Sequence, residues 1–190
     1  MKCDIVLAGV GGQGILTIAA IIGKVAVAEG LHVKQSEIHG MSQRGGSVFS
    51  HLRLSDEPVW ADQITAGNAD ILVAMEPMEA LRYAQMLSPD GVLVTNAAAV
   101  VNIPDYPEYS SVLECVRTFP HAVCIDADSI AKAAGSPRAV NIVLLGAISR
   151  HIALLDSAIL ERAISEHFAA KGERVVESNL AAYQAGRAIN

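Results

Sequence analysis

The sequence predicts an α/β protein of three layers, α/β/α, whose mainly parallel, Rossmann-like sheet is followed by a helical carboxyl-terminal part. Strand-like apolar runs alternate with helical patterns as far as about residue 135, and helical patterns alone follow. Of the residues, 52% are hydrophobic but only 4% are aromatic, which suits aliphatic helices packed on a buried parallel sheet. We expect one domain over 1–190, with the sheet core at about 4–135 and the carboxyl-terminal helices at about 138–188.

The elements of the first part follow from their apolar patterns. An apolar, β-branched run at 4–10 ends in glycines and predicts a buried strand. Residues 15–29 place their apolar side chains on one helical stripe, which Gly30 ends. Strands are predicted at 32–36 and at 48–54. Between them, 37–47 has neither helical nor strand period and predicts a polar, glycine-bearing loop.

The later elements are predicted in the same way. The apolar run at 70–75 is a strand, and Pro77 suits the first turn of a helix that continues over 78–87. Residues 88–91 form a turn signal, and 102–109, with two prolines, predicts an irregular segment. The remaining elements are strands at 92–95 and 123–126, a short helix that Gly135 ends, and helices at 138–154, 157–170 and 173–187.

Parallel strands with right-handed crossovers place the loops after their carboxyl ends at one edge of the sheet. We therefore expect the loops after Val10, Ser36 and Met75 to meet there, and all three contain unusual residues.

The first of these loops is a glycine turn, GVGGQG at 9–14, between a predicted strand and a predicted helix. Its glycines let the backbone turn sharply and let an oxygen-rich ligand approach the amino terminus of the helix, where free N–H groups favour a phosphate. The alternative is that the glycines only permit tight packing of strand on helix. The candidate ligand-binding residues are Gly11, Gly12, Gln13 and Gly14.

A stored dinucleotide is weakly supported. Such a site adds an acid at the end of the second strand to hold a ribose, and the candidate, Glu37, comes late and opens the polar loop. Adenylylating enzymes share the doubled glycine, but they need an Asp closing the second strand and arginines in the next helix, and 15–29 contains none.

The second loop contains a fixed cation, hydroxyl and amide donors and two flexible glycines, a set that suits a carboxylate or a phosphate. The alternative is a solvated loop whose arginine pairs with a nearby carboxylate. A neighbouring histidine, His39, has the chemistry of a general acid or base, but a loop histidine also serves as a structural hydrogen-bonding residue. The candidate ligand-binding residues of the loop are Ser42, Gln43, Arg44, Gly45 and Gly46.

Charge and cysteine content exclude several classes of function. With 14 basic and 20 acidic residues the net charge is −6, which argues against a nucleic-acid partner. The most membrane-like stretch, 15–28, is short and carries Lys24, and Asp4 interrupts any signal-peptide core, so we expect a cytoplasmic protein without a membrane partner. The three cysteines lack Cys-x-x-Cys spacing, and we expect buried free thiols with no metal site of this chain's own.

Four motifs, in order, resemble the gamma-type domain of 2-oxoacid:ferredoxin oxidoreductases. They are GVGGQGI at 9–15, EIHGMSQRGGSV at 37–48, AMEPMEAL at 74–81 and NIVLLGA at 141–147. The HGMSQRGG form is most similar to the beta subunit of the indolepyruvate ferredoxin oxidoreductase branch. The resemblance covers about residues 4–150.

The resemblance implies a division of labour between two chains. A large alpha subunit would hold thiamine diphosphate, Mg²⁺ and iron–sulfur clusters, and this small subunit would bind no cofactor alone. The reaction would convert an aryl pyruvate and coenzyme A into acyl-CoA and CO₂, while ferredoxin, a further partner, is reduced. A free-standing NAD- or ATP-dependent enzyme, or a binding module without chemistry, remains the alternative.

The resemblance also suggests roles for the candidate residues. Arg44, Ser42 and the Gly45–Gly46 backbone would bind the substrate carboxylate or a phosphate of coenzyme A, and the glycine turn would add backbone N–H donors. Glu76 would position a donor group or cap a helix. Asn141, polar in an apolar helix, would hold a loop or contact a ligand.

Overall fold

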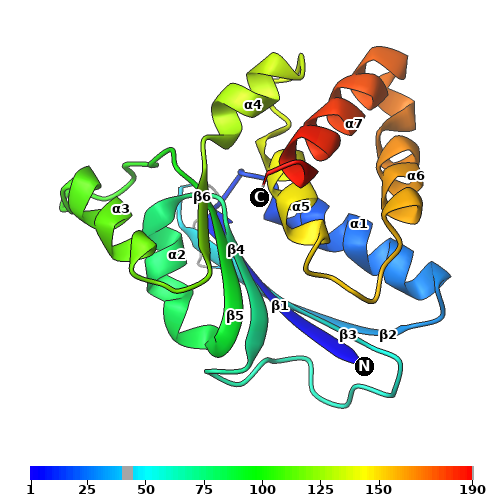
Figure 1. The fold of residues 1–190 in the computed structure, drawn as a ribbon, viewed down its shortest axis with the longest axis horizontal. Coiled ribbons are helices and arrows are strands. Elements are labelled where there is room, and N and C mark those ends of the chain that lie inside the picture. The colour runs from blue at the N-terminus through cyan, green and yellow to red at the C-terminus, as the bar shows by residue number, and fades with distance from the viewer. Residues whose placement is uncertain (40–44, 190) are drawn as a thin grey trace.

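The computed structural model describes residues 1–39 and 45–189, and its strands form one six-stranded sheet in the order β2-β3-β1-β4-β5-β6 (Figure 1). The strands are β1 (Lys2–Val10), β2 (His32–His39), β3 (Ser47–Ser55), β4 (Ala69–Ala74), β5 (Leu87–Asn96) and β6 (Ala122–Ile125). The helices are α1 (Ile15–Ala28), α2 (Pro77–Tyr83), α3 (Tyr109–Arg117), α4 (Ala127–Ala133), α5 (Val140–Ser149), α6 (Ser157–Phe168) and α7 (Glu173–Arg187), with 3₁₀ turns η1 (Ala84–Met86) and η2 (Ala169–Lys171).

The sheet is mostly parallel, as predicted. β1, β4, β5 and β6 pair in parallel, whereas β3 is antiparallel to both β1 and β2. The reversal of β3 follows from chain length, because the connection between His39 and Ser47 is too short for the crossover of a dozen or more residues that parallel neighbours need.

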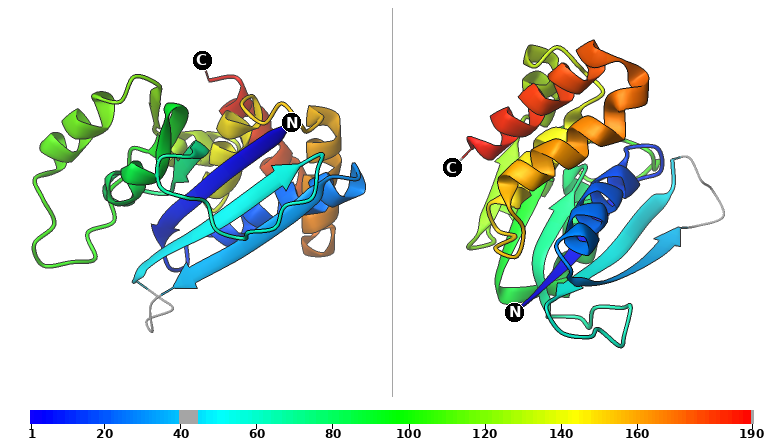
Figure 2. Two further views of the ribbon diagram at one scale, coloured as in Figure 1. Left: turned by 90° about the horizontal axis from the view of Figure 1, so that it is seen from below. Right: turned by 90° about the vertical axis from the view of Figure 1, so that its right-hand side faces the viewer.

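Helices cover both faces of the sheet, which confirms the three-layer α/β/α prediction. α1, α5, α6 and α7 lie on one face and α2 and α3 on the other (Figure 1), and Figure 2 shows α6 beside α1. The side chains of β1 alternate between the two cores: Ile5 and Leu7 pack toward the first group of helices, and Val6 and Ala8 toward the second. All four residues are fully buried. Because successive side chains of a strand point to opposite faces, β1 contributes to the cores on both sides of the sheet.

Three local predictions were wrong, and the helix predicted at 138–154 ends at Ser149. Residues 37–39 are strand and not loop, because they pair with β3 through Glu37–Ser50 and His39–Val48. Residues 88–91 lie within β5, where the register against β4 shifts between Ala69 and Ile71, so the turn signal marks an irregularity in a strand. Helix α3 was not predicted, although Glu108 caps it and Val112 and Val116 bury its inner face.

Among the described residues, no helix is long and apolar enough to cross a membrane. The three cysteines are free; Cys3 is buried and Cys124 half-buried, but Cys115 is exposed on α3, so the prediction that all three are buried was wrong for Cys115. Burial raises the pKa of the Cys3 thiol to about 12, which keeps this thiol protonated and unreactive.

Candidate functional site

The strands bring the predicted loops to one edge of the sheet. Ala8 of β1 pairs with Ala74 of β4, and Ala74 pairs with Thr95 of β5, so these strands end side by side. β2 reaches the same edge because His39 pairs with Val48, next to the pair formed by Val10 and Ser47. The ends of β1, β2 and β4 therefore lie at one edge, as predicted, and residues 40–44 of the second loop lie outside the described residues.

The glycine turn follows β1 directly and leads into α1. Gly12 and Gly14 have φ values of 102° and 83°, in the left-handed region that side chains disfavour, and this explains glycine at both positions. Gly14 is the residue before α1, and no side chain caps the helix there. The N–H of Thr17 donates to the carbonyl of Gly14 at 3.1 Å, so the N–H groups of Ile15 and Leu16 are the ones left for water or a ligand.

The side chain of Gln13 fastens the turn to the sheet. Its Oε1 accepts a hydrogen bond from the N–H of Val10 at 2.6 Å, and its Nε2 donates to the carbonyl of Met75 at 3.4 Å. One amide therefore connects the turn after β1 with the residue after β4.

The glycine turn and the end of the second loop form one unit. The N–H of Gly11 donates to the carbonyl of Gly46 at 2.8 Å, and the N–H of Gly45 donates to the carbonyl of Gly11 at 3.4 Å. Asn102 adds a bond from its Nδ2 to the carbonyl of Gly45 at 2.7 Å. Because the N–H groups of Gly11, Gly45 and Thr17 are used within the protein, the available backbone donors are those of Gly12 and of the first two residues of α1. Ser42, Gln43 and Arg44 lie outside the described residues, as does the side chain of His39.

Glu76 is buried at the start of α2 and holds the segment that follows β5 through a hydrogen bond. Its Oε1 accepts from the N–H of Glu79 at 2.8 Å and so caps α2, and its Oε2 accepts from the hydroxyl of Tyr106 at 2.8 Å. Only 1% of Glu76 is exposed. Burial, and then the neighbouring Glu76 carboxylate, raise the pKa of Tyr106, so this hydroxyl keeps its proton and donates it.

Asn141 holds the glycine turn from the side of α5. Its Nδ2 donates to the carbonyl of Gly14 at 3.1 Å, although the two residues are far apart in the sequence. A Cβ at Gly14 would lie 2.8 Å from the same nitrogen, so this contact also requires glycine. Asn141 is buried, and it lines a cavity beside the turn.

In the described part of the chain, three cavities lie next to the glycine turn. One of about 500 Å³ lies along the start of α1 and is lined partly by Gly12, Thr17 and Glu37. A second, of about 430 Å³, lies between the turn and the ends of β4 and β5, and a third, of about 330 Å³, lies between the turn and α7. Arg138 lines both of the latter, and Lys171 lines the third.

The sequence does not predict that Arg138 and Lys171 lie beside the glycine turn. One signal was available for Arg138, which stands directly before the amino terminus of α5, where the helix dipole disfavours a cation. Nothing in the sequence places Lys171 near the glycine turn.

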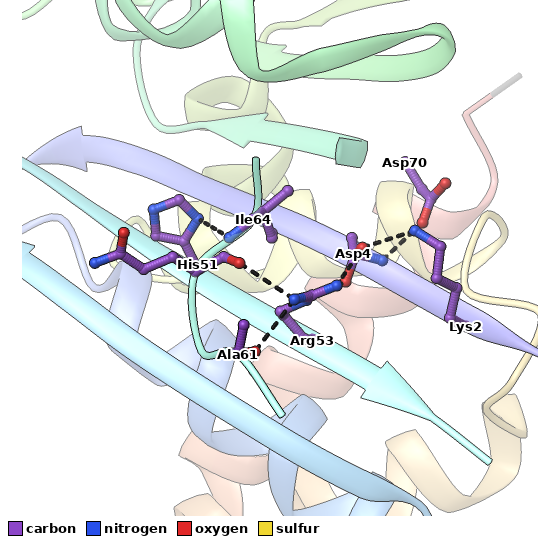
Figure 3. A network of polar contacts seen from close by, with 8 residues as sticks. Lys2, Asp4, His51, Arg53, Ala61, Ile64 and Asp70 are labelled. Carbon is purple, nitrogen blue, oxygen red and sulfur yellow. Dashed lines mark hydrogen bonds and ion pairs between the residues drawn. The ribbon is translucent and has the colours of Figure 1, made fainter. Parts of the chain in front are cut away.

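A polar network at the other end of the strands, away from the glycine turn, stabilises the fold (Figure 3). The carboxylate of Asp4, 2% exposed, accepts from Arg53 Nε at 2.8 Å and from Lys2 Nζ at 2.8 Å. Burial opposes ionisation of Asp4, but these cations outweigh it and lower its pKa. Arg53 also donates to the carbonyls of Ala61 and Gln63 at 3.2 Å, so the network anchors the loop between β3 and β4.

No metal centre is indicated in the part of the chain that the structure describes. There, no three His, Cys, Asp or Glu side chains are grouped so as to hold a metal ion.

Sequence comparison assigns the family. The model for the pyruvate ferredoxin/flavodoxin oxidoreductase family matches residues 4–189, and the chain belongs to this family. It is 37% identical over 194 residues to indolepyruvate oxidoreductase subunit IorB of Archaeoglobus fulgidus, covering 98% of this chain and 94% of that protein. The resemblance based on the four motifs is thereby confirmed. The family does not support the free-standing NAD- or ATP-dependent enzyme that the glycine turn alone left open.

Solved structures agree with this assignment. The gamma subunit of a keto/oxoacid ferredoxin oxidoreductase from Geobacter sulfurreducens is 26% identical with a TM-score of 0.71, and the match covers 97% of this chain and 95% of that one. A 2-oxoglutarate:ferredoxin oxidoreductase from Magnetococcus marinus, with 2-oxoglutarate, coenzyme A and succinyl-CoA bound, is 26% identical with a TM-score of 0.78. That match covers 98% of this chain but only 30% of the other, so the present fold corresponds to one part of a longer chain there.

Proposed function

We propose that this protein is the small subunit of an indolepyruvate:ferredoxin oxidoreductase, which converts an aryl pyruvate and coenzyme A into acyl-CoA, CO₂ and reduced ferredoxin. The observation that carries the proposal is the 37% identity to the indolepyruvate oxidoreductase subunit over 98% of the chain. The HGMSQRGG motif at 39–46 supports the same branch of the family.

The proposal divides the reaction between two chains. Thiamine diphosphate, Mg²⁺ and the iron–sulfur clusters belong to a large alpha subunit, where thiamine supplies the carbanion chemistry of decarboxylation and the clusters pass electrons to ferredoxin. The role of this subunit is to bind and orient an anionic part of a substrate.

The glycine turn and the second loop are the proposed binding elements. Gly12 and the uncapped start of α1 offer N–H donors to an anion, and the bonds of Gly11 with Gly45 and Gly46 fix the glycine turn to the end of the second loop. Arg44 is proposed to add bidentate hydrogen bonds to the substrate carboxylate or to a phosphate of coenzyme A.

An Arg44→Ala variant of the reconstituted complex tests the role of this loop. We expect the KM for the 2-oxoacid or for coenzyme A to rise at least tenfold, since a hydrogen bond between charged groups contributes about 1.5–3 kcal/mol. Unchanged KM values for both substrates would remove Arg44 from the binding site.

The assembly itself is tested by purification of the tagged chain from its native host. The proposal predicts a brown large subunit that co-purifies and contains thiamine diphosphate and iron. A chain that purifies without such a partner, and whose melting temperature rises strongly with NAD or ATP, would instead indicate a free-standing nucleotide-dependent enzyme.

A further inference from the structure

The loop between β3 and β4, residues 56–68, displays the only tryptophan of the chain to solvent. Trp60 is 90% exposed, although aromatic residues make up just 4% of the sequence. Pro58 and Val59 line a cavity of about 350 Å³ together with Trp60. Met1, which is 71% exposed, is hydrogen-bonded through its backbone to the first residue of the loop. These four residues form an apolar surface, called here the Trp60 surface.

The backbone of the loop that carries Trp60 is fastened to the sheet. Arg53 Nη1 donates to the carbonyls of Ala61 and Gln63, each at 3.2 Å, and the N–H of Ile64 donates to Nδ1 of the buried His51 at 3.2 Å (Figure 3). The side chain of Ile64 is itself buried in the core on the α2 side of the sheet. The indole is therefore presented on a fixed backbone, and a partner that binds it has little ordering of the chain to offset.

The residues around Trp60 give this surface a negative charge. Segment 56–63 contains three acids and no Lys or Arg. The carboxylate of Asp56 pairs with the amino terminus, but those of Glu57 and Asp62 take part in no hydrogen bond or ion pair within the described part of the chain. The cations nearby, in the network of Figure 3, are already paired with Asp4. An exposed indole thus lies between two carboxylates that are not neutralised.

The charge of the Trp60 surface favours a different chain over a second copy of this one. Trp is enriched among the residues that dominate the binding energy of protein interfaces, and opposite charges around such a residue set the choice of partner. A second copy, in a two-fold contact, would oppose Glu57 and Asp62 with the same acids, and like charges across an interface are unfavourable. The complementary partner has an apolar pocket with Lys or Arg at its rim.

The apolar character of the Trp60 surface favours a permanent partner. Ferredoxin, as an electron carrier, dissociates after each reduction, and such transient redox contacts are small, whereas permanent interfaces are larger and more hydrophobic. In the Magnetococcus marinus enzyme the matching fold makes up only 30% of a longer chain, so there the fold is permanently joined to the rest of that chain. Of the partners in the proposed function, the large subunit is the permanent one.

We propose that the Trp60 surface is a docking site for the large alpha subunit, and that Trp60 enters an apolar pocket with a basic rim on that chain. The inference rests on the proposed function, which supplies the large subunit as a partner. It deepens that function with a contact away from the glycine turn, because the loop after β3 lies at the other end of β1, beside the amino terminus (Figure 1). The large subunit thereby holds this chain at both ends of its strands.

Binding of the full chain to the purified large subunit, measured by calorimetry, tests the proposal through Trp60→Ala. We expect the Kd to rise at least about tenfold, as is typical when a central Trp of an interface is truncated, and Trp60→Phe to restore most of the affinity. The side chain is exposed, so the melting temperature of the free chain should not change. Val27→Ala is the matched control, because Val27 is an exposed apolar residue on α1. A Kd within about twofold of wild type for Trp60→Ala would overturn the proposal.

The charges are tested by Glu57→Gln combined with Asp62→Asn. Both carboxylates are exposed and unpaired in the described part of the chain, so the substitutions should leave the fold intact. We expect the Kd for the large subunit to rise several-fold at low salt, and its dependence on salt to become weaker. A Kd that is unchanged or lower at low salt would overturn the basic rim of the proposed pocket.

Hydroxyl-radical footprinting reports on Trp60 itself in the assembled enzyme. Because water is excluded from the centre of an interface, the rate of oxidation of this indole should fall to roughly a fifth or less when the large subunit binds. An equal rate in the free and the assembled chain would contradict docking at this residue.

Two measurements detect other occupants of the Trp60 surface. Sedimentation of the isolated chain would reveal a dimer, and self-association that Trp60→Ala abolishes, with unaltered binding of the large subunit, would overturn the proposal in favour of a second copy. A raised KM for ferredoxin in a Trp60→Ala complex that assembles normally would overturn it in favour of ferredoxin.

The same variants separate this inference from the proposed function. An active complex whose assembly is unaffected by Trp60→Ala would refute the docking site alone. A complex whose assembly depends on Trp60, but which reduces no ferredoxin with any 2-oxoacid and coenzyme A, would refute the proposed function alone.

Discussion

Replacement of Gly14 with alanine perturbs the glycine turn at its most constrained residue. Gly14 has a φ of 83°, and its carbonyl accepts the hydrogen bond from Asn141 Nδ2 at 3.1 Å. An added Cβ would lie 2.8 Å from that nitrogen, which is too close for any real contact. The variant therefore combines backbone strain with the loss of the bond that connects α5 to the turn.

The two effects have known magnitudes. An alanine in the left-handed region costs roughly 1–2 kcal/mol, and loss of one hydrogen bond costs about 1 kcal/mol. The free energy of unfolding should thus fall by about 2–3 kcal/mol, and for a chain of this size the melting temperature should fall by roughly 5–10 °C.

The backbone strain and the lost hydrogen bond are measured separately by thermal and urea unfolding of Gly14→Ala, Asn141→Ala and the double variant. In the Asn141→Ala background the clash is absent, so Gly14→Ala should cost only the backbone strain. Gly12→Ala is the matched control, because Gly12 has a φ of 102° but no atom within 4 Å of its added Cβ. A Gly14→Ala variant that loses less than about 0.5 kcal/mol, or one whose loss is identical with and without Asn141, would refute the reasoning.

Three further predictions concern buried polar groups. Tyr106→Phe removes a donor to the buried Glu76 carboxylate and should lower the free energy of unfolding in urea by about 1.5–3 kcal/mol; no change would mean that water replaces the hydroxyl. Arg53→Ala leaves the carboxylate of Asp4 poorly compensated and should cost about 3 kcal/mol, most of which Asp4→Asn in the same chain should restore. Burial lowers the pKa of His51, so the folded state binds its proton less readily than the unfolded chain, and this residue should reduce stability as pH falls below about 6.5. Melting temperatures between pH 7.5 and 5 should decline less steeply in His51→Asn, and parallel declines would contradict this assignment.

Local signals predicted the elements whose pattern is complete in the sequence. The strand that ends in Val10, the glycine turn and the helix that begins at Ile15 are adjacent in the chain, and all three were predicted. The extension of β2 to His39 depends on pairing with Val48 and was missed, because an edge strand that faces solvent has no apolar period. The reversed direction of β3 follows from the short connection between His39 and Ser47, which is recognised only once the end of β2 is known.

The candidate site also contains both residues that the sequence predicts and residues that only the structure reveals. Asn141 was found because a polar residue in an apolar helix needs a partner, but its partner, Gly14, is known only from the fold. Arg138 and Lys171 carry no motif, and only the packing of α5, η2 and α7 around the glycine turn brings them to one cavity. The structure alone therefore shows that these two cations line one cavity.

Ferredoxin reduction by the purified large subunit, with and without this chain, is the most direct measurement of the proposed function. With indolepyruvate and coenzyme A present, the two chains together should reduce ferredoxin, and omission of this chain, of the 2-oxoacid or of coenzyme A should abolish the reaction. An equal rate from the large subunit alone would show that this protein does not complete the enzyme.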